Sequence, residues 1–139
     1  MRFADANIFL YAFLHPKERL AEKQTILKTT AKSIVTGMEK DEKVITSVVQ
    51  LSEICNILEA RASHRFAQEV IESILLNDNI EIAEVSKETY VASVELAKLY
   101  NININDCVAL AVMQSRNIKE IYSFDADFDK IEGIKRVEK

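Results

Sequence analysis

The chain has 139 residues, a formal net charge of −4 and an apolar content of 48%. This length suits one domain with its own hydrophobic core, and the sequence lacks the run of ~18 uncharged apolar residues that a membrane-spanning helix needs. The mildly acidic charge gives none of the basic surface typical of strong nucleic-acid binders, and the scarcity of glycine and proline argues against a loop-rich β-sandwich.

In chain order, hydrophobic periodicity and capping residues predict strands and helices that alternate through much of the sequence. They are strand 2–4, helices 6–14 and 18–39, strand 43–46, helices 48–62 and 64–77, strand 80–85, helices 86–100 and 106–116, and strands 120–123 and 134–137. This pattern predicts an α/β fold: a single three-layer domain over residues 1–139, with a mainly parallel central sheet flanked by helices.

Local signals set several boundaries of these elements. Pro16 stops the first helix, and Ser47 with Gln50 forms a possible capping box for the third. Asn103 or Asn105 is expected to cap the last helix. The helix over residues 64–77 is expected to bury Ala67, Val70, Ile71, Ile74 and Leu75.

The N-terminal stretch is apolar, but Asp5 interrupts it and no convincing small-residue cleavage site follows. Cys55 and Cys107 are the only cysteines, and no CxxC spacing exists, which argues against a zinc knuckle or a redox pair. We therefore expect a cytoplasmic protein that makes no contact with a membrane.

Four carboxylates occupy positions that are unusual for acidic side chains. Asp5 and Asp125 each directly follow an expected strand. Glu53 lies on the apolar side of its expected helix, and Asp106 opens a helix that is apolar on nearly every side.

Each acid also has a simpler structural explanation. Asp5 and Asp125 are suitable N-caps, and Asp106 complements the dipole of the helix that it begins. Taken singly these explanations are favoured, because caps are commoner than metal ligands. Glu53 is harder to explain, since a carboxylate beside a buried face costs free energy unless Lys, Arg or a metal neutralises it.

The four positions together favour a shared site. In a parallel sheet the functional crevice lies beyond the carboxyl ends of the strands, where Asp5 and Asp125 are expected. Asp106 and Glu53 can approach the same end from their helices. Several carboxylates in one place repel one another, and a hard divalent cation such as Mg²⁺ or Mn²⁺ removes that conflict.

These segments resemble the signature of the PIN-domain (PilT N-terminus-like) ribonuclease family, and in particular its VapC-like toxins. The matching pieces are DAN at the N-terminus, SE on an apolar helix, NDCVALA and SFDADF. Each piece alone is unspecific, but four pieces in this order and at fitting intervals span the chain from Asp5 to Phe128.

The resemblance implies an Mg²⁺- or Mn²⁺-dependent endoribonuclease whose catalytic and metal-binding residues are Asp5, Glu53, Asp106 and Asp125. Asn7 and Ser123 match polar positions that support such a site. Asp127 is either an outer ligand or a surface acid, and the surface is favoured. A VapC-like toxin further implies an RNA substrate, an antitoxin partner and a homodimer.

Other functions remain open at this point. The acids from Asp125 to Asp129 resemble the start of a calcium loop, but Lys130 and Arg136 replace its glycine and its glutamate. A phosphatase or phospho-receiver would need a second acid near Asp5, where Asn7 stands instead. A PIN domain that processes RNA, or a degenerate one that only scaffolds an assembly, is also compatible with the sequence.

Overall fold

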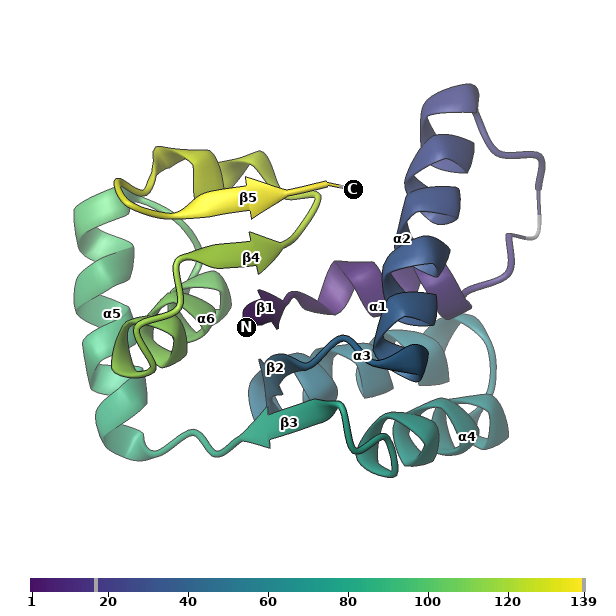
Figure 1. The fold of residues 1–139 in the computed structure, drawn as a ribbon, viewed down its shortest axis with the longest axis horizontal. Helices are drawn as coiled ribbons and strands as arrows, with labels where there is room; N and C mark the ends of the chain where they lie inside the picture. The colour runs from purple at the N-terminus through teal and green to yellow at the C-terminus, as the bar shows by residue number, and fades with distance from the viewer. Residues whose placement is uncertain (17, 139) are drawn as a thin grey trace.

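The structure of the protein, a computed structural model, describes residues 1–16 and 18–138. These residues form six α-helices, five β-strands and one short 3-10 helix, η1 (Figure 1). In chain order the elements are β1 (Arg2–Ala4), α1 (Ala6–Phe13), α2 (Glu22–Lys40), β2 (Val44–Ser47), α3 (Val48–Arg61), α4 (His64–Leu75), β3 (Ile80–Ala83), α5 (Lys87–Tyr100), α6 (Ile104–Ser115), β4 (Glu120–Tyr122), η1 (Ala126–Lys130) and β5 (Lys135–Val137).

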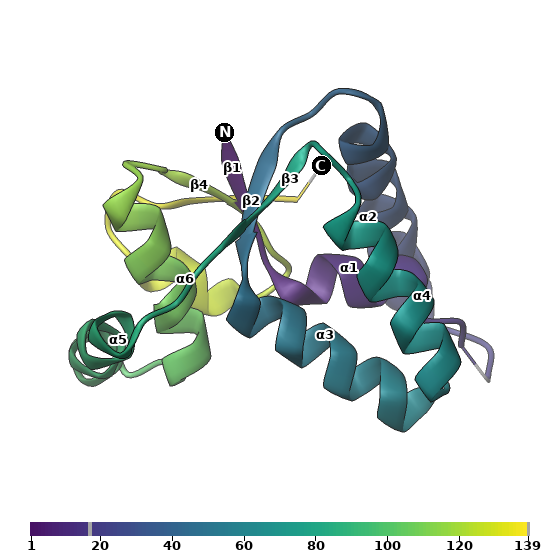
Figure 2. The same cartoon turned by 90° about the horizontal axis from the view of Figure 1, so that it is seen from below.

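The strands form one sheet in the order β3-β2-β1-β4-β5, and every neighbouring pair is parallel. Successive strand residues face opposite sides of the sheet. Phe3 and Ile45 therefore enter a core with α6, whereas Ala4 and Val44 enter a second core with α1 to α4. Figure 2 shows α5 and α6 on one side of the strands and α1 to α4 on the other. The predicted three-layer α/β fold is confirmed.

Two details of the predicted helices are wrong. The helix expected over residues 18–39 begins only at Glu22, where the main-chain N–H of Ala21 donates to Gln24 Oε1. Leu75 is 55% exposed. It follows the buried Ile74 by one residue, and successive side chains of a helix point about 100° apart, so Leu75 is turned away from the core. Within the described residues, no helix combines the length and the apolar character needed to cross a membrane.

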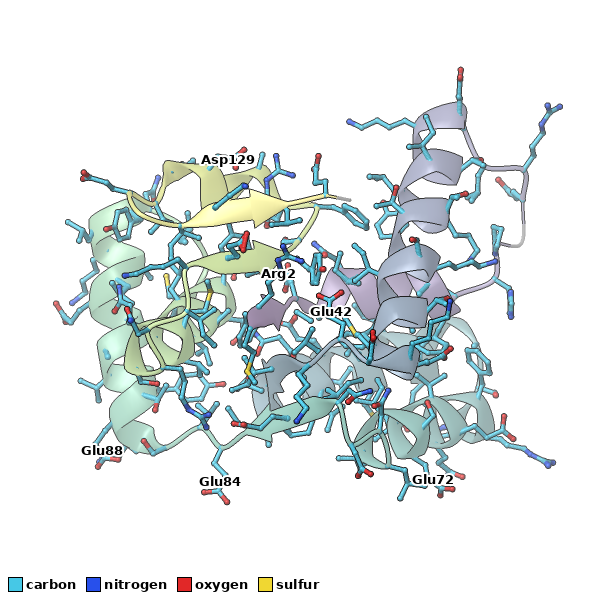
Figure 3. All side chains as sticks on the ribbon, viewed as in Figure 1. Arg2, Glu42, Glu72, Glu84, Glu88 and Asp129 are labelled. Carbon is cyan, nitrogen blue, oxygen red and sulfur yellow. The ribbon has the colours of Figure 1, made fainter. Side chains whose placement is uncertain are left out.

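The amino end of the sheet is held together by Arg2, which Figure 3 labels beside Glu42. The guanidinium donates to the hydroxyl of Tyr122 at 2.6 Å and lies over its ring, 5.0 Å from the centroid. It also pairs with Glu42 at 3.5 Å and with Glu120 at 3.4 Å. Both carboxylates at this end of the strands therefore have a cationic partner.

Lys28 on α2 binds the end of α1. Its ammonium donates to the main-chain oxygens of Leu14 at 2.5 Å and Tyr11 at 2.9 Å, which lie where a helix leaves carbonyl groups unsatisfied. Lys28→Met is expected to lower the free energy of unfolding by ~1–2 kcal/mol, because it removes a charged donor and keeps the aliphatic stem. Urea unfolding measures the change. The exposed Lys32→Met is the matched control, and equal effects of the two variants would contradict the assignment.

Candidate metal centre

The site lies where the order of the strands reverses. Within the sheet, β2 and β3 lie on one side of β1, and β4 and β5, which come later in the chain, lie on the other side of β1. In an open α/β sheet a crevice forms beyond the carboxyl ends of the strands at such a point. Asp5 directly follows β1 and Ser123 directly follows β4, and the Ser123 hydroxyl donates to Asp5 Oδ2 at 2.7 Å.

Asp5 is buried, with 5% of its surface exposed. Its Oδ1 accepts the main-chain N–H of Ala6 at 2.8 Å, so Asp5 is the N-cap of α1 as its simpler explanation predicted. Burial raises the pKa of the Asp5 carboxyl group to about 6, against the hydrogen bonds from Ser123 and Ala6, which lower it. The charges of Glu53 and Asp125 raise it further.

Asp106 lies in the first turn of α6, which begins at Ile104 because Asn103 Oδ1 accepts the main-chain N–H of Asp106 at 2.9 Å. Burial, followed by the charges of Asp5, Asp125 and Glu53 and by a hydrogen bond with Asp125, raises the pKa of the Asp106 carboxyl group to about 7. One of its oxygens, Oδ2, is buried and has no hydrogen-bond partner in the described part of the chain. An orphaned buried oxygen of this kind requires an explanation.

Asp125 and Asp127 come from the segment that joins β4 to η1. The main-chain N–H of Asp125 donates to Ser123 Oγ at 3.0 Å, and Asp125 Oδ1 caps η1 by accepting the N–H of Asp127 at 2.9 Å. Asp106, Asp125 and Asp127 each offer one carboxylate oxygen within 4.8 Å of the others. Asp127 also forms an ion pair with Lys130 at 3.0 Å, so it belongs to the cluster and to the surface at once.

Glu53 reaches the cluster from α3. Its Oε1 accepts a hydrogen bond from Asn105 Nδ2 at 2.8 Å, and its charge raises the pKa values of Asp5 and Asp106. An ion pair with Lys or Arg was the alternative explanation for this acid. None forms within residues 1–16 and 18–138, so the alternative has no support there.

Asn7 and Ser123 connect the acids to one another. Asn7 Nδ2 donates to Ser123 Oγ at 3.4 Å, and Asn7 Oδ1 accepts the main-chain N–H of Phe124 at 3.4 Å. Ser123 is fully buried and its single hydroxyl contacts Asp5, Asn7 and the N–H of Asp125. Hydrogen bonds therefore link Asp5, Asn7, Ser123 and the main chain of Asp125, while Asp106, Asp125 and Asp127 form a group within 4.8 Å of one another. Asp5 and Glu53 lie outside that group and act on Asp106 through their charges.

Two residues of the site were assigned other roles from the sequence. Gln50 was expected to cap its own helix, but its side chain contacts the Ser47 hydroxyl and donates to the main-chain oxygen of Asn105 at 3.3 Å. Asn105 was a candidate cap for α6, but Asn103 fills that role and Asn105 binds Glu53. No local sequence signal could have paired residues that are 52 or 55 positions apart.

The chemistry of the cluster fits a hard divalent cation. In contrast to the amino end of the sheet, the described residues provide no ion-pair partner for any of the four predicted ligands, Asp5, Glu53, Asp106 and Asp125. Carboxylate oxygens are the ligands that Mg²⁺ and Mn²⁺ prefer. A bound cation would remove the mutual repulsion and give Asp106 Oδ2 a partner.

Comparison with solved structures places this architecture among known folds. Mycobacterium tuberculosis VapC20, described as a Sarcin-Ricin loop cleaving toxin, is 23% identical, with a TM-score of 0.75 over 93% of each chain. A chain of a toxin-antitoxin complex from Klebsiella pneumoniae is 18% identical, with a TM-score of 0.66 over 97% of this chain and 96% of that one. A chain of Rickettsia felis VapBC2, bound to a fragment of promoter DNA, is 16% identical, with a TM-score of 0.69 over 98% of this chain and 96% of that one.

The sequence itself was compared with curated proteins and with family models. No curated protein matches it. The family model of the PIN domain matches residues 2–134, which is nearly the whole chain and includes all the acids described above. The chain therefore belongs to the PIN domain family.

Proposed function

We propose that this protein is a metal-dependent endoribonuclease and the toxin of a type II toxin–antitoxin pair. The observation that carries the proposal is the group of Asp106, Asp125 and Asp127 within 4.8 Å of one another, on which the charges of Asp5 and Glu53 also act, with one buried oxygen of Asp106 left without a partner. Acids that form isolated caps or surface ion pairs do not gather in this way. A site that holds Mg²⁺ or Mn²⁺ and cleaves a phosphodiester explains both features.

Support for the toxin assignment comes from the similar structures. One is described as a toxin that cleaves the sarcin–ricin loop, and another as a toxin-antitoxin complex. RNA is therefore the substrate class that we propose for this chain. The resemblance to PIN-domain ribonucleases further suggests products with a 5′-phosphate and a 3′-hydroxyl.

The proposed roles of the residues follow from their contacts. Asp5, Glu53 and Asp106 would hold one divalent ion, and Asp125 would hold the same ion or a second one. The bound ion would supply an activated water and offset charge on the phosphate. Ser123 and Asn7 orient Asp5 and the Asp125 segment through hydrogen bonds, and Asp127 stabilises the turn beyond them.

Purified protein and isolated ribosomal RNA provide the direct test. We expect cleavage in Mg²⁺ or Mn²⁺, none in EDTA, and recovery when excess Mn²⁺ is added back. Ligation of an adaptor that requires a 5′-phosphate reads the product ends. Calorimetry without RNA should show Mn²⁺ binding. Cleavage that persists in EDTA, or a protein that binds no Mn²⁺, would contradict the proposal, and the second result would favour a degenerate scaffold.

The proposed partners follow from the same family assignment. Two similar structures are complexes that contain toxin and antitoxin or VapB and VapC components, which supports an antitoxin for this chain. We also propose a homodimer, which sedimentation of the purified protein measures. Such a pair would act in the cytoplasm, where Cys55 and Cys107, both free here, stay reduced.

A further inference from the structure

A small polar junction joins α3 to α6 directly beside the acids. Gln50 and Glu53 lie three residues apart on α3, a spacing that places them on one side of the helix. Both residues contact Asn105 of α6. Gln50 Nε2 donates to the main-chain oxygen of Asn105 at 3.3 Å, and Asn105 Nδ2 donates to Glu53 Oε1 at 2.8 Å. A single residue of α6 is therefore bound through both its backbone and its side chain.

The side chain of Asn105 is not needed to begin α6. Asn103 is the N-cap, and its Oδ1 accepts the main-chain N–H of Asp106 at 2.9 Å. The amide of Asn105 is half-buried and turns to α3 instead. Because Asp106 is the next residue along α6, the bond from Asn105 fixes where the Glu53 carboxylate lies relative to Asp106.

An amide is well suited to hold this carboxylate. It donates a hydrogen bond without cancelling the negative charge, whereas Lys or Arg would compete with a metal ion for the same oxygens. The bond uses Glu53 Oε1 and so leaves Oε2 of the same carboxylate for another partner. Gln50 is fully buried, contacts Ser47 and holds the main chain of Asn105. The residue that donates to Glu53 is therefore anchored to the interior of the protein.

We propose that Asn105 is a positioning residue of the metal centre, which holds the Glu53 carboxylate in the orientation that binds the divalent ion. This inference rests on the proposed function. It assigns to Asn105 a role that acts through Glu53, and it identifies the α3–α6 junction as the support of Glu53, the predicted ligand that α3 carries.

Calorimetric titration with Mn²⁺ tests the proposal without relying on activity. Asn105→Ala is expected to weaken Mn²⁺ binding by ~10- to 100-fold, the usual cost of losing a group that orients a ligand. Cleavage should then require more Mn²⁺, and the rate at saturating Mn²⁺ should fall less than the affinity. Asn56→Ala is the matched control, since it removes an exposed amide from the helix that carries Glu53 and leaves the amide of Asn105 in place.

A double-mutant cycle distinguishes positioning from a general effect on folding. In a Glu53→Gln background, Asn105→Ala should cause little further loss of Mn²⁺ affinity, because its action passes through Glu53. Asn105→Ser, which is too short to reach Glu53 but is tolerated near a helix start, replaces the alanine variant if that variant does not fold. Equal Mn²⁺ affinities of wild type and the Asn105 variant overturn the inference alone. A wild-type protein that binds no Mn²⁺ overturns the proposed function and the inference with it.

Discussion

Replacing Asp5 by asparagine is expected to lower metal-dependent RNA cleavage by at least ~100-fold and to stabilise the metal-free protein at neutral pH. Asp5 is buried, and the pKa of its carboxyl group is raised to about 6. Asparagine has almost the same shape and can still accept the N–H of Ala6 through Oδ1. The asparagine side chain is uncharged, however, and so cannot balance the positive charge of a bound cation. A variant that loses activity while its stability rises has lost a metal ligand, whereas a misfolded variant would lose both activity and stability.

The gain in stability depends on pH in a direction that the raised pKa of Asp5 sets. The unfolded chain ionises Asp5 near its ordinary pKa of about 3.8, whereas the folded protein keeps the proton up to about pH 6. Between these values the folded state holds more protons, so the free energy of unfolding falls as pH rises, and it stays low above pH ~6. A shift of two pKa units corresponds to ~3 kcal/mol, which is the upper bound for the increase in the free energy of unfolding of Asp5→Asn at neutral pH.

Urea unfolding in EDTA at about pH 4 and about pH 7.5 measures this difference. The wild type and Asp5→Asn should differ little in acid and clearly at the higher pH. Asp78→Asn is the matched control, because Asp78 is exposed and takes no part in the metal cluster. Full cleavage of RNA by Asp5→Asn in Mg²⁺ would contradict the assignment of Asp5 as a ligand.

Asp106→Asn is expected to have a comparable effect on cleavage, at least ~100-fold, for a different structural reason. Asp106 Oδ2 is buried without a partner, and the charges of Asp5, Asp125 and Glu53 help to raise the pKa of this carboxyl group to about 7. The variant removes one of the four mutually repelling charges, so the metal-free protein should unfold at a higher temperature. The Mn²⁺ affinity of the variant should fall, because asparagine at position 106 carries no negative charge to bind the cation.

Thermal unfolding with and without Mn²⁺ tests Asp106→Asn directly. Bound metal stabilises the folded state by an amount that grows with the logarithm of its concentration divided by its Kd, so Mn²⁺ should raise the unfolding temperature of the wild type and hardly change that of the variant. The Asp78→Asn control should respond to Mn²⁺ as the wild type does. An Asp106→Asn protein that Mn²⁺ stabilises to the wild-type extent would show that Asp106 is not a ligand.

The fold was predictable because its signals are local. Periodic apolar residues identified the helices and strands, and their alternation predicted the parallel sheet. The errors arose where distant contacts decide. The exposure of Leu75 depends on which side of α4 packs against the rest of the protein.

Candidate acids could be named from the sequence because Asp5 and Asp125 follow strands and so fit two roles. Each of them uses one oxygen to cap a main-chain N–H, and each still acts on Asp106 through its charge. The sequence could name them as candidates in either role. It could not identify Gln50 and Asn105, because their partners lie on another helix and leave no periodic trace along the chain.

The capping bonds of Asp5 and Asp125 bear on how the proposed centre would bind a metal ion. Both carboxylates are already tethered to the peptide groups of Ala6 and Asp127 in the metal-free structure. The positions of these two side chains would therefore be set by the fold before a cation arrives, and binding would need no folding step.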